Sequence, residues 1–224
     1  MSDYDFSMFT RADLVKLCHQ RSSDPTVAMQ ARLETVADGP EFEALRSEIT
    51  AFVMAEITET FAAIRPAFDK IKPKSLADIG CGYAFIDLLI HRATGCRLTL
   101  IDIEESERIY FRYHPEGAGY SNLSISRAFL EANGVPKAKI TTLNPRDGDL
   151  SALPPVDMAM SLLSCGFHYP VATYIDFIRS HVRKGVVMDL RRRAPEGREL
   201  LEGWGTTRTL HRGIKHDSVV ALRW

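Results

Sequence analysis

Two closely spaced glycines, Gly80 and Gly82, are the residues best placed to bind a ligand. A short apolar run at 75–79 precedes them, and an apolar pattern with helical spacing begins at Phe85. Glycine permits backbone angles closed to other residues and lets a ligand approach the chain closely. The helix that follows begins with free N–H groups pointing toward the same place. The stretch therefore predicts a ligand-binding strand–turn–helix unit.

An acidic residue, Asp102, ends the next predicted strand, twenty-two positions after Gly80. This is close to the ~20-residue interval at which a carboxylate reaches a ribose hydroxyl. A dinucleotide site would need a third glycine where Phe85 stands, and phenylalanine is too bulky for that role. An NAD(P)-dependent oxidoreductase is therefore disfavoured. An ordinary βα turn followed by a surface aspartate is the alternative without a ligand.

The pattern Asp-x-Gly-x-Gly-x-Ala, residues 78–84, resembles motif I of the class I methyltransferases, which use S-adenosyl-L-methionine (SAM). Ala84 replaces the usual third glycine and is still small. The resemblance implies SAM as the cofactor, bound by the turn and by the strand ends beside it. The cofactor-binding residues implied in this way are Asp78, Gly80, Cys81, Gly82, Asp102, Ile103, Asp147 and Ser164.

From residue 75 onward, predicted strands alternate with helices, which indicates a parallel sheet. The strands are expected at 75–79, 97–101, 139–143, 156–161 and 186–190, with a closing hairpin at 206–210 and 218–222. A closing antiparallel hairpin is typical of the class I methyltransferases, so the resemblance extends over 76–224. The predicted fold is α/β, with a doubly wound, seven-stranded, mostly parallel sheet that ends in this hairpin.

Residues 1–73 contain no convincing strand and are expected to form a helical N-terminal cap or lid, with 74–224 as the methyltransferase domain. Helices are expected at 13–20, at 24–37 and from Glu41, the last one kinked or ended by Pro66. A stripe of apolar residues fits a cap on the sheet, a lid over the substrate or a homodimer face equally well.

Polar residues also follow the third strand, where the resembled family often contacts the adenine amino group. Asp147 is favoured for this contact, while Asn144 and Asp149 compete with it. Each of the three could instead shape a turn.

The loop after the fourth strand contains His168 and Tyr169, which we expect to be the catalytic residues. It corresponds to motif IV of the family but lacks the Asn/Asp-Pro-Pro-Tyr signature, which disfavours DNA adenine and protein glutamine as acceptors. Histidine titrates near neutrality and suits a base that removes a proton from a hydroxyl. Alternatively, both side chains simply pack against the next helix.

Three further residues are expected to contact the substrate: Tyr113 and His114 after the second strand, and Arg191 after the fifth. A guanidinium at a strand end can hold a carboxylate or phosphate by paired hydrogen bonds, so the acceptor could be anionic. The run of arginines at 191–193 also fits an ordinary solvated face.

The composition restricts the class of partner. A formal net charge of −1 argues against non-specific nucleic-acid binding. The four cysteines lack metal-ligand spacing and fit a reducing compartment. The N-terminus lacks a signal-peptide pattern, and no apolar stretch approaches the ~20 residues of a membrane span. We therefore expect a cytoplasmic protein without a metal, a nucleic-acid partner or a membrane partner.

The sequence thus predicts a SAM-dependent methyltransferase that acts on a hydroxyl, or less readily an amine, of a small molecule. It is loosely similar to bacterial small-molecule and sugar O-methyltransferases. The alternatives are an NAD(P)-dependent oxidoreductase and a non-catalytic SAM-binding scaffold, because a fold does not fix a function.

Overall fold

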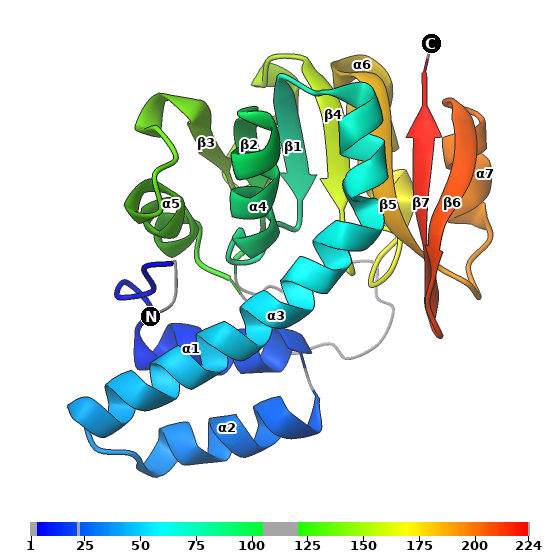
Figure 1. The fold of residues 1–224 in the computed structure, drawn as a ribbon. Helices are drawn as coiled ribbons and strands as arrows, with labels where there is room; N and C mark the ends of the chain where they lie inside the picture. The colour runs from blue at the N-terminus through cyan, green and yellow to red at the C-terminus, as the bar shows by residue number, and fades with distance from the viewer. Residues whose placement is uncertain (1–3, 22, 105–120, 224) are drawn as a thin grey trace.

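The computed structural model describes residues 4–21, 23–104 and 121–223. Its strands are β1 (Ser75–Ile79), β2 (Arg97–Ile101), β3 (Ile140–Leu143), β4 (Val156–Ser161), β5 (Val182–Arg191), β6 (Thr206–Arg212) and β7 (His216–Leu222). They form one sheet in the order β3-β2-β1-β4-β5-β7-β6 (Figure 1). The first five strands run parallel, and β7 lies antiparallel to both of its neighbours. The predicted fold class is confirmed.

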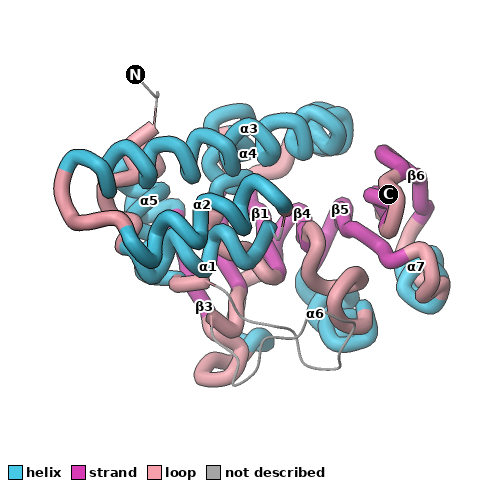
Figure 2. The backbone as a smooth tube through the Cα atoms, turned by 90° about the horizontal axis from the view of Figure 1, so that it is seen from below, coloured by secondary structure: helices cyan, strands magenta, loops and turns pink. Residues whose placement is uncertain are grey.

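Helices cover both faces of the sheet. They are α1 (Arg11–Arg21), α2 (Asp24–Thr35), α3 (Pro40–Ile71), α4 (Phe85–Thr94), α5 (Leu123–Ala132), α6 (Ile175–His181) and α7 (Glu196–Glu202). Short 3₁₀ turns occur at Lys137–Lys139, Leu150–Ala152 and Val171–Tyr174. Seen from below, α3 and α4 lie on one side of the strands and α6 lies on the other (Figure 2). The sheet is therefore a layer between helices, as a parallel sheet requires.

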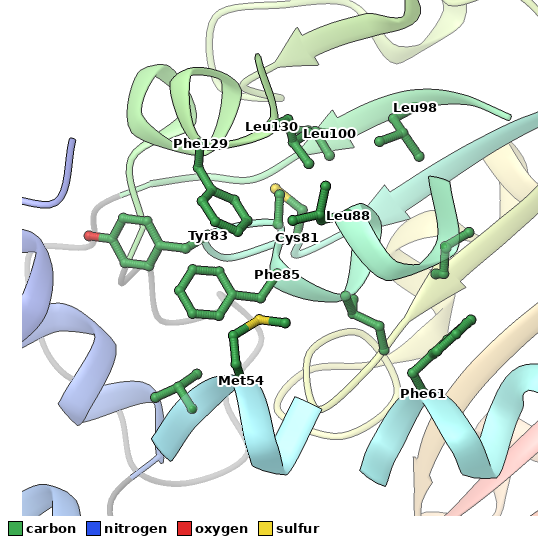
Figure 3. Close-up of a cluster of buried hydrophobic side chains, with 14 of the residues drawn as sticks. Met54, Phe61, Cys81, Tyr83, Phe85, Leu88, Leu98, Leu100, Phe129 and Leu130 are labelled. Atoms are coloured by element: carbon green, nitrogen blue, oxygen red, sulfur yellow. The ribbon is translucent and has the colours of Figure 1, made fainter. Parts of the chain in front are cut away.

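Alternation along each strand divides the core between these faces. Leu98 and Leu100 of β2 pack toward α3, α4 and α5, whereas Ile101 joins the residues that face α6. On the first face, Met54 of α3 and Phe85 of α4 belong to the same buried cluster (Figure 3). The N-terminal helices therefore share one hydrophobic core with the sheet, while the boundary at residue 73 stays a prediction.

Two helix predictions change. Helix α3 continues past Pro66 to Ile71, so of the two alternatives predicted there, a kink or an end of the helix, the end is wrong. Proline removes a helical hydrogen bond, but Ala67 and Phe68 of the next turn are buried, and that packing holds the turn in place. Helix α5 begins at Leu123, three residues before Ser126, where the sequence pattern predicts its start, because the side chain of Asn122 accepts hydrogen bonds from the first free N–H groups.

The N-terminal helices reach the edge of the sheet where the parallel strands end. In Figure 1 the arrows of β1 and β4 point toward the side on which α1 and α2 lie, and α3 crosses obliquely in front of the sheet. Ligands of open α/β sheets bind beyond this carboxyl edge. Helices α1 and α2 therefore lie on the side where a ligand is expected. None of the described helices is both long enough and apolar enough to cross a membrane.

Candidate functional site

The glycine turn between β1 and α4 has the backbone that its sequence predicts. Gly80, Gly82 and Ala84 all have positive φ, at +77°, +55° and +58°. The N–H of Gly80 donates to the carbonyl oxygen of Ile101 at 2.7 Å, which ties the turn to the end of β2. A Cβ on Gly80 would lie 1.9 Å from Ser164 Oγ. The turn therefore has no room for a side chain at residue 80.

Asp102 is bound directly to this turn. Its carboxylate accepts one hydrogen bond from the Gly82 N–H and one from the Glu104 N–H, both at 2.9 Å. Burial raises the pKa of Asp102, and these two N–H groups oppose that rise because they favour the charged form. Each oxygen retains a lone pair that can accept from a ligand hydroxyl. The proposed ribose contact is compatible with this geometry and stays a prediction.

A second carboxylate at the end of β2, Glu104, was missed from the sequence. It accepts hydrogen bonds from the Leu123 N–H at 2.8 Å and from Asn144 Nδ2 at 3.2 Å. Asn144 Nδ2 also donates to the carbonyl oxygen of Ile103 at 3.5 Å. The Asp-Ile-Glu sequence directly after a strand was the available signal, because both acids could face the same edge.

The polar residues after β3 differ in where their side chains lie. Asn144 reaches the end of β2, whereas Asp147 is exposed. Asp149 accepts from the Ser151 N–H at 2.8 Å and thereby caps a short 3₁₀ turn. The geometry thus favours Asn144 over Asp147 as the polar side chain nearest the expected cofactor, and Asp149 has a local structural role.

Asp78, implied as a cofactor residue, lies beneath the turn and not on its surface. It is 3% exposed and interacts with Asp87 of α4, which is fully buried. Burial raises the pKa of Asp87 to about 7, and burial together with the charges of Asp87 and Asp102 raises the pKa of Asp78 well above its usual value. Cys81 is also buried, which raises its pKa and keeps the thiol neutral. These side chains support the turn from below.

The loop after β4 brings Ser164 and Tyr169 to the glycine turn. The hydroxyl groups of the two residues lie 3.1 Å apart. A Cβ on Gly80 would also lie 3.8 Å from the Tyr169 hydroxyl oxygen. Burial raises the pKa of Tyr169 well above its usual value, so the phenol stays protonated and can donate a hydrogen bond. Tyr169 therefore lies beside the glycine turn, and its neutral phenol is a poor candidate for a base.

His168 has the properties of a neutral proton acceptor. Its Nδ1 is buried, and no described group hydrogen bonds to it. Burial and the charge of Arg191 lower the pKa of His168, so the imidazole is neutral at pH 7. The Nε of Arg191 donates to the carbonyl oxygen of Phe167 at 2.7 Å, and its guanidinium lies 4.6 Å from the Phe167 ring centroid. Arg191 therefore holds this loop in place and also puts a positive charge near His168.

Strand β7 adds His216, which the sequence did not single out. The side chains of His216 and His168 both approach the Phe167 ring edge-on, with centroids 5.6 and 4.9 Å away. His216 Nε2 lies 3.7 Å from Asp189 Oδ2, and the same oxygen accepts from the Leu163 N–H at 3.1 Å. A buried aspartate thus joins the loop after β4 to the hairpin.

The N-terminal helix α1 contacts the glycine turn. The Tyr83 hydroxyl donates to Asp13 Oδ1 at 3.0 Å, and a Cβ on Gly82 would lie 3.0 Å from Gln20 Nε2. The predicted substrate residues Tyr113 and His114 lie outside the described residues. Among the residues that are described, no group of three His, Cys, Asp or Glu side chains could hold a metal ion.

A dinucleotide is poorly accommodated by this turn. Phe85 occupies the third-glycine position of a dinucleotide motif, and its ring is buried 4.8 Å from the Phe129 ring and 5.5 Å from the rings of Phe6 and Phe9. In a dinucleotide site, a small residue at this position lets the helix pack closely beside the pyrophosphate. Here an aromatic cluster fills that space.

Scanning the sequence against protein-family models gives no match, and a search of curated proteins finds no similar sequence. Solved structures do resemble it. Magnesium protoporphyrin IX methyltransferase from Synechocystis PCC 6803, solved with bound SAM, matches with a TM-score of 0.50 at 13% identity, covering 94% of this chain and 97% of that one. The methyltransferase domain of bacterial CtHen1 matches with a TM-score of 0.54 at 13% identity, covering 73% and 97%. The chain has the fold of the class I SAM-dependent methyltransferases.

Proposed function

We propose that this protein is a SAM-dependent methyltransferase. The observation that carries the proposal is the glycine turn at the carboxyl edge of β1, held against β2 by Asp102. Gly80 has no room for a side chain, because Ser164 lies directly against it. Class I methyltransferases bind their cofactor at this place in the fold, and the similar Synechocystis enzyme was solved with SAM.

The residues around the turn suit the chemical groups of SAM. Asp102 and Glu104 offer carboxylate oxygens for ribose hydroxyls at the end of β2. Asn144 can reach toward the adenine side, and Ser164 and Tyr169 offer hydroxyl groups above Gly80. When bound, SAM supplies an activated methyl group on a sulfonium, so the chain needs chiefly to position the acceptor and exclude water.

The acceptor that we propose is a hydroxyl group of a small molecule. Support comes from His168, a partly exposed and neutral imidazole on the loop after β4, which could take a proton from the attacking hydroxyl. Arg191 and His216 lie beside the same aromatic ring and could orient an anionic substituent. Helix α1 lies over the turn, which suits a lid that excludes water from the transfer.

Calorimetric titration tests the cofactor directly. We expect SAM and its demethylated product, S-adenosylhomocysteine (SAH), to bind, with neither NAD nor NADP competing. Gly80→Val should abolish binding, because the branched side chain would meet Ser164. Gly134→Val is the matched control, since Gly134 also has positive φ but a Cβ there meets nothing within 4 Å. Tight NADP binding, or unchanged SAM binding by Gly80→Val, would overturn the proposal.

Turnover separates an enzyme from a SAM-binding scaffold. Protein loaded with methyl-labelled SAM is incubated with a mixture of hydroxylated metabolites, and label transfer is followed by mass spectrometry. An enzyme should transfer label to a particular acceptor, and His168→Ala should slow this transfer by about 10²–10⁴-fold, the usual contribution of a general base. SAM binding without transfer to any acceptor would favour the scaffold.

A further inference from the structure

A pair of buried carboxyl groups lies beneath the glycine turn, on two different elements. Asp78 belongs to β1 and Asp87 to α4, and both are almost completely shielded from solvent. Among the residues that the structure describes, no group donates a hydrogen bond to Asp78 Oδ1 or to either carboxylate oxygen of Asp87. Two buried carboxyl groups without another donor regain a hydrogen bond by holding a proton between them. The pair therefore has a reason to stay protonated.

The groups that face this pair are acidic or neutral. Asp102 approaches from the end of β2, and its charge acts on Asp78. The thiols of Cys81, in the turn, and Cys96, just before β2, also face the acidic side chains. Burial raises the pKa of Cys96 to about 11 and that of Cys81 well above its usual value, so both thiols are neutral. Each proton that the pair loses therefore adds one negative charge beneath the turn.

The place of this charge matters for the cofactor, which the proposed function puts on the turn. Asp78 is two residues before Gly80, and the neighbouring Asp102 holds the Gly82 N–H. SAM carries a sulfonium, an ammonium and a carboxylate, and so has one net positive charge. SAH lacks the sulfonium and has no net charge. A negative charge in this low-dielectric region attracts SAM more strongly than SAH.

We propose that the Asp78–Asp87 pair makes the cofactor site distinguish SAM from SAH by releasing a proton to solvent when the cationic cofactor binds. This inference rests on the proposed function. No bond to carbon or sulfur changes in this step, because one proton leaves the pair and the positive charge of SAM takes its place. After methyl transfer the positive charge is gone, the pair takes a proton back, and release of neutral SAH is favoured.

Linkage fixes the sign of the pH dependence. A ligand that binds better to the ionised pair lowers its pKa, so the affinity for SAM rises as the pH rises through the pKa of the free protein. Burial raises the pKa of Asp87 to about 7, which puts this change near neutrality. SAH has no sulfonium, so its affinity lacks this dependence. The ratio of the two affinities is therefore the quantity to measure.

Calorimetric titration of the full chain with SAM and SAH, from about pH 6 to about pH 8, measures this ratio. We expect SAM to gain about fivefold over SAH across this range, because a pKa shift of about one unit from about 7 changes the ratio about tenfold over the whole titration. Repeating the titration near pH 7 in buffers with different ionisation enthalpies counts protons. SAM binding should release part of a proton, and SAH binding should release less.

Asp87→Asn keeps the shape of the side chain and removes its titration. In this variant the affinity ratio should become nearly independent of pH, and the extra proton release should disappear. Titration of the ligands' own amino groups is common to wild type and variant and cancels in the comparison. Asp157→Asn, at the opposite end of the sheet beside Lys184, is the control and should keep the wild-type dependence. If Asp87→Asn does not fold, Asp78→Asn gives the same test.

Two results would overturn the inference and leave the proposed function intact: an affinity ratio in wild type that does not change with pH, or a change that persists in both Asp87→Asn and Asp78→Asn. Failure of both SAM and SAH to bind at any pH would overturn the proposed function as well. The outcomes are therefore distinguishable.

Discussion

Gly80→Ala tests directly whether the folded structure requires glycine at residue 80. The backbone at Gly80 has φ +77°, a region that costs an L-residue about 1–2 kcal/mol. The new Cβ would lie 1.9 Å from Ser164 Oγ and 2.5 Å from Ser164 Cβ. Ser164 must therefore move, and its hydrogen bond with Tyr169, worth about 0.5–1.5 kcal/mol, is lost.

The two costs together predict that Gly80→Ala lowers the free energy of unfolding by about 1.5–3.5 kcal/mol. Gly95→Ala is the matched control. Gly95 has φ +69°, and a Cβ there would meet just the Lys139 Nζ, at 4.0 Å. This variant carries the backbone strain without the clash and should lose about 1–2 kcal/mol.

Urea unfolding measures the free energy of unfolding of both variants. The two values can be compared when the free energy depends equally on the urea concentration in both. Adding Ser164→Gly to Gly80→Ala removes the side chain that clashes and should restore part of the stability, measured as a double-mutant cycle. A clash between residues 80 and 164 is excluded if Gly80→Ala loses no more stability than Gly95→Ala, or if the double-mutant cycle shows no coupling between the two residues.

Three further outcomes follow from named contacts. Tyr83→Phe removes the donor to buried Asp13 and should cost about 1–3 kcal/mol in thermal unfolding, where a change below about 0.3 kcal/mol would contradict the contact. Asp87 binds its proton more tightly when folded, so wild-type stability should fall as the pH rises from about 4 through 7. Asp87→Asn should therefore gain more over wild type at about pH 8 than at about pH 5 in urea unfolding, and equal gains would count against the raised pKa. In single-turnover transfer, the wild-type rate should rise with pH through a pKa below the usual histidine value, because burial and Arg191 favour neutral His168; the same limb in His168→Gln would assign it elsewhere.

The sequence determined the centre of the fold. Three of its strand predictions, 75–79, 97–101 and 156–161, have the same bounds in the structure. These strands are buried on both faces of a parallel sheet, so most of their residues are apolar, and glycine, proline or polar residues follow or precede them. The turn at Gly80 is equally local, since its positive φ requires a particular residue type.

Other elements depended on packing between distant residues. Strand β5 begins at Val182, four residues before the predicted start, and includes the exposed residues Arg183 and Lys184. Pairing with β4, with a register shift near Met158, keeps these polar residues in the strand despite their composition. Helix α3 passes Pro66 for a similar reason, because its last turn is buried against the core.

For the candidate site, the sequence determined which loops carry the side chains, and the tertiary structure decided which side chains meet. Ser164, His168 and Tyr169 share one loop, yet two of them approach the glycine turn and His168 approaches Arg191. His216 reaches this loop because antiparallel pairing of β7 with β5 puts it opposite Arg191. Backbone angles respond to neighbouring residues and can be read along the chain, whereas side-chain contacts depend on strand order, register and helix packing, which only the folded chain fixes.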